Sequence, residues 1–254
     1  MRHREYGSPP RTVVVVHGGP GGAGEVAPVA QELAKLGYGT LEPFQTEASV
    51  AGQVAELRGT IRRLTRPPVV LIGWSWGAWL ACLLAARHPS LVSKLILVGS
   101  APFEARYAEA IMPTRLSRLT EGERSELASL SASLDEPARL ARFLALLEKA
   151  DSYAPTDEPQ PEIVFDKKIH EAVWAEAASL RRSGELLRLV AAIGCPVVAL
   201  HGDHDPHPAE GVERPLRSKL PDLEFVLLSR CGHKPWREPH ARQAFFRELG
   251  KAIG

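Results

Sequence analysis

The sequence predicts one α/β domain, with a mainly parallel sheet of about six strands, helices on both faces and a helical insertion. Short apolar runs of strand length alternate with longer helix-type patterns along most of the 254 residues. Parallel strands need crossover connections of helix length, so this alternation favours a parallel sheet. The alternation stops between residues 103 and 190, where only helical patterns occur.

The core elements follow in order along the chain. The β-branched run Thr12–Val16 predicts the first core strand, and the apolar run Pro67–Ile72 predicts a buried strand before a glycine-rich turn. Further strands are expected at Tyr38–Phe44, Lys94–Val98, Cys195–His201 and Leu223–Leu228. Helices are expected at Glu25–Leu36, Val50–Leu64, Ser75–His88 and Pro235–Ile253, the last with Ala244, Phe245, Leu249 and Ile253 as its inner stripe.

The helical insertion divides the core into residues 1–102 and 191–254. Within residues 103–190 we expect helices at Thr120–Leu134, Glu136–Lys149 and Ile169–Leu189, and no strand. The acidic, proline-rich segment Tyr153–Pro161 predicts an exposed loop.

Composition limits the possible partners. A net charge of +1 with no basic stripe argues against nucleic acid, and the apolar runs are too short for a membrane span or a signal segment. We therefore expect a cytoplasmic protein with a small-molecule substrate; the sequence does not indicate its oligomeric state. The three cysteines predict free thiols. Zinc ligation by Cys231, His233 and His201 matches no known ligand spacing, so no metal or other cofactor is expected.

Gly73-Trp74-Ser75-Trp76-Gly77 lies between a predicted strand and a predicted helix. This context is typical of a nucleophile elbow, in which the serine occupies a strained turn and presents its hydroxyl at the head of a helix. Glycines on both sides keep side chains out of the crowded strand–helix junction. Ser75 is therefore the candidate nucleophile.

A glycine-rich loop, His17-Gly18-Gly19-Pro20-Gly21-Gly22, follows the first core strand. It matches neither the dinucleotide fingerprint nor a P-loop. Its unshielded N–H groups suit an oxyanion hole, for which the second donor is the N–H of the residue after the nucleophile. We expect Gly19 and Trp76 to be these donors.

Candidate acid and base residues follow the last two predicted strands. Asp205 lies in Gly202-Asp203-His204-Asp205-Pro206, and His233 lies in Cys231-Gly232-His233-Lys234-Pro235. The carboxyl ends of parallel strands meet at one edge of a sheet, and the order Ser, Asp, His matches a known hydrolase triad. Asp203 is the alternative acid. Whether Cys231 lines the site stays open.

Together these motifs resemble the α/β-hydrolase superfamily, from His17 to about Pro239. The pair His-Gly-Gly-Pro-Gly-Gly and Trp-Ser-Trp-Gly is similar to the proline iminopeptidase branch. The resemblance implies Ser75 as nucleophile, Asp205 as acid, His233 as base, and Gly19 with Trp76 as oxyanion donors. It places the 103–190 insertion as a cap above the triad. The short segment before Thr12 and the short cap depart from that branch, and no N-terminal hairpin is expected.

The motifs favour a serine hydrolase that cleaves a small ester or lactone through an acyl-enzyme. An N-terminal-residue aminopeptidase is the alternative; it needs a cap carboxylate for the substrate amine, and Glu104, Glu109, Glu162 and Glu176 are candidates. A ligand-binding protein without turnover is the alternative from another class. His17, Trp174 and Trp236 are candidates for the substrate pocket.

Overall fold

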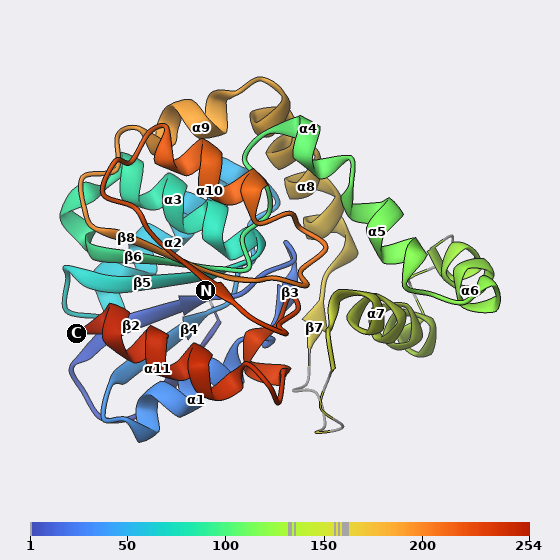
Figure 1. The fold of residues 1–254 in the computed structure, drawn as a ribbon. Coiled ribbons are helices and arrows are strands. Elements are labelled where there is room, and N and C mark those ends of the chain that lie inside the picture. The colour runs from blue at the N-terminus through green and yellow to red at the C-terminus, as the bar shows by residue number, and fades with distance from the viewer. Residues whose placement is uncertain (1, 132–133, 135, 155, 157, 159–162) are drawn as a thin grey trace.

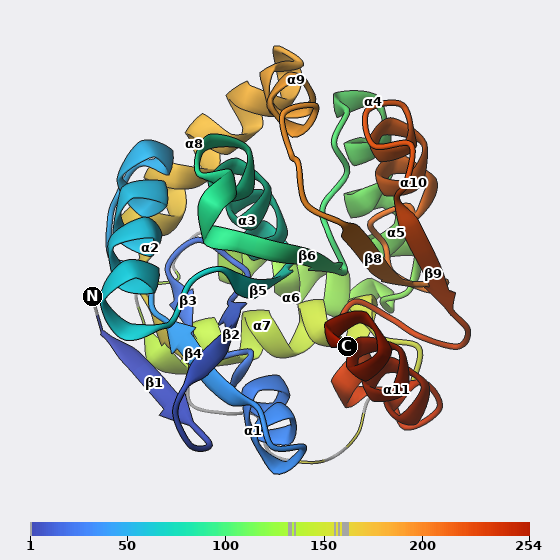
Figure 2. The ribbon, with the colours of Figure 1, turned by 90° about the vertical axis from the view of Figure 1, so that its left-hand side faces the viewer.

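The computed structural model describes residues 2–131, 134, 136–154, 156, 158 and 163–254. Seven strands form one sheet in the order β1-β4-β2-β5-β6-β8-β9 (Figures 1 and 2). They are β1 (His3–Tyr6), β2 (Arg11–Val16), β4 (Gly39–Pro43), β5 (Val69–Trp74), β6 (Val92–Val98), β8 (Val197–Gly202) and β9 (Glu224–Leu228). All pairs are parallel except β1 with β4. The predicted mainly parallel α/β fold is confirmed.

Helices cover both faces of this sheet. The core helices are α1 (Ala27–Lys35), α2 (Val50–Leu64), α3 (Trp76–Arg87), α10 (Glu210–Arg217) and α11 (Arg242–Ile253), with short 3₁₀ turns at Pro89–Leu91 and Pro235–Arg237. The insertion contains α4 (Ala105–Ala108), α5 (Ile111–Ser117), α6 (Glu121–Ser131), α7 (Pro137–Asp151), α8 (Lys167–Arg182) and α9 (Glu185–Val190). In Figure 1, α1 and α11 lie below the sheet, and α2, α3, α9 and α10 lie above it.

The alternation of side chains along β2 explains the two layers. Val13 and Val15 join the apolar cluster that includes Leu33 of α1 and Phe245 of α11. Val14 and Val16 join the cluster on the other face, formed largely by α2 and α3. Because successive strand residues point to opposite faces, a strand with apolar residues at every position must be covered on both sides.

Only part of the insertion packs as a separate unit. Leu127 and Leu130 of α6, Leu146 and Ala150 of α7, and the connecting Leu119 form a small apolar cluster. Leu116 of α5 packs against it. Val173 and Ala177 of α8, with Leu186 and Val190 of α9, instead belong to the core cluster around α2 and α3. Figure 1 shows α5, α6 and α7 extending to one side of the sheet. We call these three helices the outer cap.

The structure adds several elements that the sequence did not predict. The sheet has seven strands rather than about six, because His3–Tyr6 pairs antiparallel with β4 and the Tyr6 hydroxyl donates to the buried Glu42 at 2.8 Å. A two-residue strand, β7 (Val164–Phe165), pairs with β3 (Gly22–Ala23), so the expectation of no strand in the insertion was wrong. It fastens the insertion to the glycine-rich loop.

Some predicted helix boundaries differ from those observed. The predicted helix Ile169–Leu189 is two helices, because Gly184 adopts φ 74° between them. The final helix begins at Arg242 rather than Pro235, after a 3₁₀ turn, and Phe245 and Leu249 are buried as expected. Part of Tyr153–Pro161 and the end of Thr120–Leu134 lie outside the described residues. Within the described residues, the helices are too short or too polar to cross a bilayer.

Candidate active site

Ser75 occupies the tight turn between β5 and α3 and has φ 54° and ψ −119°. A non-glycine residue in this region of backbone space is strained, and such strain is maintained only by tight surroundings. A Cβ added to Gly77 would collide with the backbone carbonyls of Val16 and His17, and one added to Gly73 would collide with Gly77. The turn has the geometry that a nucleophile elbow requires.

Ser75 lies beside the loops that carry Asp205 and His233. Its N–H donates to the carbonyl of Val98 at 3.0 Å, at the end of β6. A Cβ on the next residue, Gly99, would lie 3.2 Å from His233 Nδ1 and 3.4 Å from Asp205 Oδ2. On the other side, the indole N–H of Trp74 donates to the carbonyl of His233 at 2.9 Å. The three predicted residues therefore gather at one edge of the sheet.

The loop between β8 and α10 directs Asp205 toward His233. Asp205 Oδ2 accepts a hydrogen bond from His233 Nδ1 at 2.7 Å, and both side chains are buried. The alternative acid, Asp203, instead accepts a hydrogen bond from the backbone N–H of Cys231 at 3.1 Å. Of these two carboxylates, only that of Asp205 contacts the imidazole.

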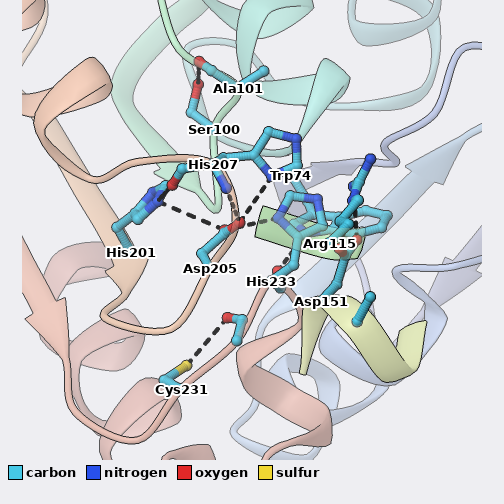
Figure 3. A network of polar contacts seen from close by, with 12 residues as sticks. Trp74, Ser100, Ala101, Arg115, Asp151, His201, Asp205, His207, Cys231 and His233 are labelled. Atoms are coloured by element: carbon cyan, nitrogen blue, oxygen red, sulfur yellow. Dashed lines mark hydrogen bonds and ion pairs between the residues drawn. The ribbon is translucent and has the colours of Figure 1, made fainter. Parts of the chain in front are cut away.

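Asp205 has two further histidine neighbours that the sequence did not predict (Figure 3). His207 donates to Asp205 Oδ1 from its ring Nδ1 at 2.8 Å and from its backbone N–H at 2.9 Å. His201, at the end of β8, has its Nε2 3.6 Å from Asp205 Oδ2 and 2.7 Å from the carbonyl of His207. The Asp205 carboxylate thus lies among three imidazoles.

The charges of this cluster follow from its contacts. Burial alone would raise the pKa of Asp205, but the neighbouring His233, His207 and His201 outweigh it and hold that pKa well below the usual range. Burial, together with repulsion from His233, lowers the pKa of His207 to about 4. At neutral pH, Asp205 is therefore an anion and His207 is neutral.

The outer cap contacts the base directly. The backbone N–H of His233 donates to the carbonyl of Asp151, at the end of α7, at 2.9 Å. The Asp151 carboxylate forms a two-point ion pair with Arg115 of α5 at 2.6 and 2.7 Å. Figure 3 shows this pair beside His233. Contact with the cap thus holds the backbone of the base.

Glu238 connects the same two regions. Its buried carboxylate accepts N–H groups from Gly232 at 2.9 Å, Tyr153 at 2.7 Å and Ala154 at 2.9 Å. The first lies immediately before the base, and the other two follow α7. One carboxylate therefore joins the base loop to the chain that leaves the outer cap.

The glycine-rich loop passes beside Ser75. A Cβ on Gly18 would lie 3.0 Å from Ser75 Cβ and would overlap the Trp74 ring. The next residue, Gly19, has φ 31°, and its carbonyl accepts the N–H of Gly22 at 2.7 Å. Trp76 is the first residue of α3, where backbone N–H groups have no partner within the helix. Trp76 thus directly follows the serine, and Gly19 is the residue after the glycine that contacts it.

The three pocket candidates have structural partners. His17 is fully buried, with its Nδ1 2.8 Å from the carbonyl of Gly18, and its Nε2 accepts the N–H of Gln45 at 3.1 Å. Trp236 is 2% exposed and packs edge-on against Trp74. Trp174 is half-buried and stacks on Trp79 with ring centroids 6.1 Å apart. His17 and Trp236 thus pack in the interior behind the site.

Among the described residues, one group of side chains has a composition that could bind a metal ion. Ligand atoms of Asp205, His207 and His233 lie within 4.8 Å of one another. Each imidazole, however, already uses Nδ1 to donate to Asp205, so hydrogen bonds account for this arrangement. Cys231 does not belong to this group: its thiol is fully buried and lies 3.5 Å from the carbonyl of Gly232, and burial raises its pKa.

Similar proteins include enzymes with named activities. A pimeloyl-[acyl-carrier protein] methyl ester esterase of Chromobacterium violaceum is 28% identical over 256 residues, covering 95% of this chain and 93% of that protein. A biotin biosynthesis bifunctional protein, BioHC, of Teredinibacter turnerae is 25% identical over 179 residues. That match covers 69% of this chain and 31% of the relative, so the chain spans about a third of its length.

Solved structures of similar fold have low sequence identity. VinJ aligns with a TM-score of 0.72 at 19% identity, covering 99% of this chain and 95% of that one. An enol-lactonase from Burkholderia xenovorans aligns at 0.65 with 18% identity, covering 99% and 95%. A proline iminopeptidase from Mycobacterium smegmatis aligns at 0.64 with 19% identity, covering 99% and 94%. A match at this identity shows the shared fold and does not confirm the predicted iminopeptidase branch. Residues 45–235 match the family of the alpha/beta hydrolase fold, to which this chain therefore belongs.

Proposed function

We propose that this protein is a serine hydrolase that cleaves a small carboxylic ester through an acyl-enzyme on Ser75. The observation that carries the proposal is the strained backbone of Ser75, φ 54°, beside the 2.7 Å contact between Asp205 and His233. A strained serine at a strand–helix turn next to a hydrogen-bonded Asp–His pair is the arrangement that activates a hydroxyl. The esterase names of several relatives support the same reaction class.

The hydrogen bonds support one path for the proton. His233 donates a hydrogen bond from its Nδ1–H to Asp205. Its Nε2 is therefore unprotonated, and the lone pair of this nitrogen can accept the Ser75 proton. Ser75 Oγ attacks the ester carbonyl as that proton moves, and Asp205 stabilises the imidazolium that forms. The N–H groups of Trp76 and Gly19 donate hydrogen bonds to the carbonyl oxygen and stabilise the negative charge that develops on it. The imidazolium then protonates the leaving alcohol, and water, deprotonated by the same base, releases the acid.

The names of the relatives suggest the form of the substrate. Three relatives at 26–28% identity are named pimeloyl-[acyl-carrier protein] methyl ester esterases, so by name they act on a methyl ester. We therefore propose short alkyl esters, methyl esters among them, as the first substrate class. Lactones are the second, because the same acyl-enzyme chemistry opens a ring ester.

An aminopeptidase is less well supported, because a substrate ammonium needs a desolvated carboxylate partner. Glu104 pairs with Arg106 at 2.6 Å, and Glu176 accepts the backbone N–H of Val50 at 2.8 Å. Glu109 is exposed, and Glu162 lies outside the described residues. We therefore expect short acyl esters to be hydrolysed with higher kcat/KM than prolyl or alanyl amides. Faster turnover of a prolyl amide than of every short ester would favour the aminopeptidase.

A fluorophosphonate probe and a panel of p-nitrophenyl esters test the proposal. Wild-type protein should be labelled on Ser75, and Ser75→Ala should lose labelling and at least roughly 10⁴-fold in kcat. Ser117→Ala, at an exposed position in α5, should keep both. An unlabelled, inactive wild type would instead support a ligand-binding protein without turnover. Labelling retained in Ser75→Ala would contradict the choice of nucleophile.

A further inference from the structure

His207 lies two residues after the predicted acid, in the loop between β8 and α10. Its side chain is 9% exposed, and it contacts both the acid and the base. Nδ1 lies 2.8 Å from Asp205 Oδ1, and the ring centroid lies 4.4 Å from that of His233 with 27° between the planes. A histidine whose role was only to fill space would need neither contact.

The protons in this cluster can be assigned from their partners. His201 Nε2 must donate to the carbonyl of His207 at 2.7 Å, because a carbonyl only accepts. Consistently, His201 Nδ1 is buried and has no partner among the described residues, as expected of the unprotonated nitrogen. Asp205 is an anion, so His207 Nδ1 and His233 Nδ1 each carry the proton that they donate to it.

This assignment places a different donor on each carboxylate oxygen of Asp205. Oδ1 receives the ring and backbone N–H groups of His207, and Oδ2 receives His233. A carboxylate held at Oδ1 by two donors cannot rotate without losing them. Oδ2 therefore stays directed at the base.

The groups that face His207 determine whether its ring is protonated. Asp205 favours the protonated ring, whereas burial, His233 from the loop after β9, and Arg115 from α5 of the outer cap oppose it. His201, at the end of β8, contacts only its carbonyl. The balance leaves a neutral ring stacked on the imidazole that must become positively charged during catalysis. A neutral ring there avoids the repulsion that a second imidazolium would cause.

We propose that His207 is a positioning residue of the active site, which holds Asp205 through Oδ1 and keeps the plane of the His233 ring by stacking on it. The inference rests on the proposed function, since it concerns how the acid and base of that reaction are aligned. The N–H donor of His207 also withdraws negative charge from Asp205, which limits how strongly Asp205 favours the protonated form of His233.

Two substitutions separate the donor from the ring. His207→Asn keeps a side-chain N–H close to the position of Nδ1 but removes the stacked ring, whereas His207→Phe keeps a ring but removes the donor. If the donor positions Asp205, His207→Phe should lose about 10-fold in kcat with little change in KM. The acid limb of its kcat/KM should move to higher pH, because Asp205 then bears more charge. For His207→Asn, kcat should stay within about threefold of the wild-type value. The acid limb of its kcat/KM should move less than half as far as that of His207→Phe.

A packing role predicts the opposite order, with His207→Phe near wild type and His207→Asn impaired, and that order would overturn the proposal. Thermal melting verifies that each variant folds, and the ¹⁵N spectrum of wild-type protein tests the assignment if one of them does not. Wild type and Ser75→Ala are assayed first, so that absence of Ser75-dependent turnover counts against the proposed function and not against this inference.

A spectroscopic measurement tests the assignment without activity. In ¹⁵N spectra of wild-type protein labelled at histidine, His207 should be the neutral Nδ1–H tautomer at pH 7 and should titrate near pH 4. Asp205→Asn should shift that signal. A neutral Nε2–H tautomer for His207, or a signal that ignores Asp205→Asn, would overturn the proposal.

Discussion

The two loops that carry the proposed nucleophile and its acid are held in different ways. The elbow between β5 and α3 depends on backbone packing, since Gly73 and Gly77 lie against carbonyls that leave no room for a Cβ. The loop between β8 and α10 depends on side chains. His207 donates a hydrogen bond to the carboxylate of Asp205, and His201 contacts the backbone carbonyl of His207. A backbone constraint requires particular residue types, whereas a side-chain network can be built in many ways.

This difference predicts different consequences of mutation. A larger residue at Gly73 or Gly77 should act mainly on stability, because α3 and the strands beneath it must move apart. A change in the acid loop should act mainly on rate, because the fold survives while the imidazole loses its orientation. Pairs of variants at the two loops test this difference.

The largest effect is expected within the acid loop itself. Asp205→Asn should lower kcat by roughly 10⁴-fold, because an amide nitrogen facing His233 favours the wrong tautomer. Asp203→Asn should cost less than about 10-fold, because Asp203 only accepts the N–H of Cys231 and the amide oxygen can still do so. Steady-state kinetics with one ester substrate measures both. The reverse ranking in kcat would assign the acid to Asp203.

The elbow is tested by Gly77→Ala. The added Cβ meets the carbonyls of Val16 and His17, so we expect a loss of about 3 kcal/mol in the free energy of unfolding. Gly59→Ala, in α2, is the matched control: its Cβ would meet open space, and alanine is the better helix former. Urea denaturation measures both variants. Equal stability of the two would show that backbone approach does not hold the elbow.

The same difference explains what could be predicted from the sequence. Ser75 was predicted because glycines at fixed spacing report a backbone constraint. Asp205 and His233 follow short apolar runs and match a known chain order. The structure brings Asp205 beside His233 and turns Asp203 away. His207 gave no such signal, since its contact with His233 depends on the pairing of β8 with β9 and on the fold of both loops.

Other elements were missed for related reasons. Strand β1 has the sequence His-Arg-Glu-Tyr, without apolar alternation, and its buried partner is the carboxylate of Glu42. The Arg115–Asp151 pair and Glu238 join segments far apart in the chain. Charged residues in a sequence are usually solvated, so single ones that become buried and paired have no distinguishing pattern.

An intermediate effect is expected where the base loop meets the outer cap. In Glu238→Gln, one oxygen becomes an amide nitrogen, so at least one of the three N–H groups bound by the carboxylate loses its acceptor. We expect a loss of about 2 kcal/mol in the free energy of unfolding and a several-fold lower kcat. Glu248→Gln, which removes a surface pair with Lys251, should cost under about 1 kcal/mol. A smaller loss for Glu238→Gln than for Glu248→Gln would show that this carboxylate does not hold the base loop.

The effect that is smallest from one half-unit step of pH to the next is the pH dependence of stability. Burial lowers the pKa of His17 from 6.5 to about 4, because the folded interior disfavours its charged form. Above pH 6.5 the ring is neutral in both states, and its contribution to stability is complete. Between pH 6.5 and 4 the unfolded chain binds a proton that the folded state does not. The free energy of unfolding should therefore fall by up to about 1.4 kcal/mol per pH unit from this residue.

His17→Asn, neutral at every pH, should be less stable at pH 7, since the N–H of Gln45 loses its acceptor, but its stability should decline less steeply on acidification. Urea denaturation of both proteins at half-unit steps from pH 7 to pH 4.5 measures the two slopes, and equal slopes would show that His17 does not resist protonation in the folded state.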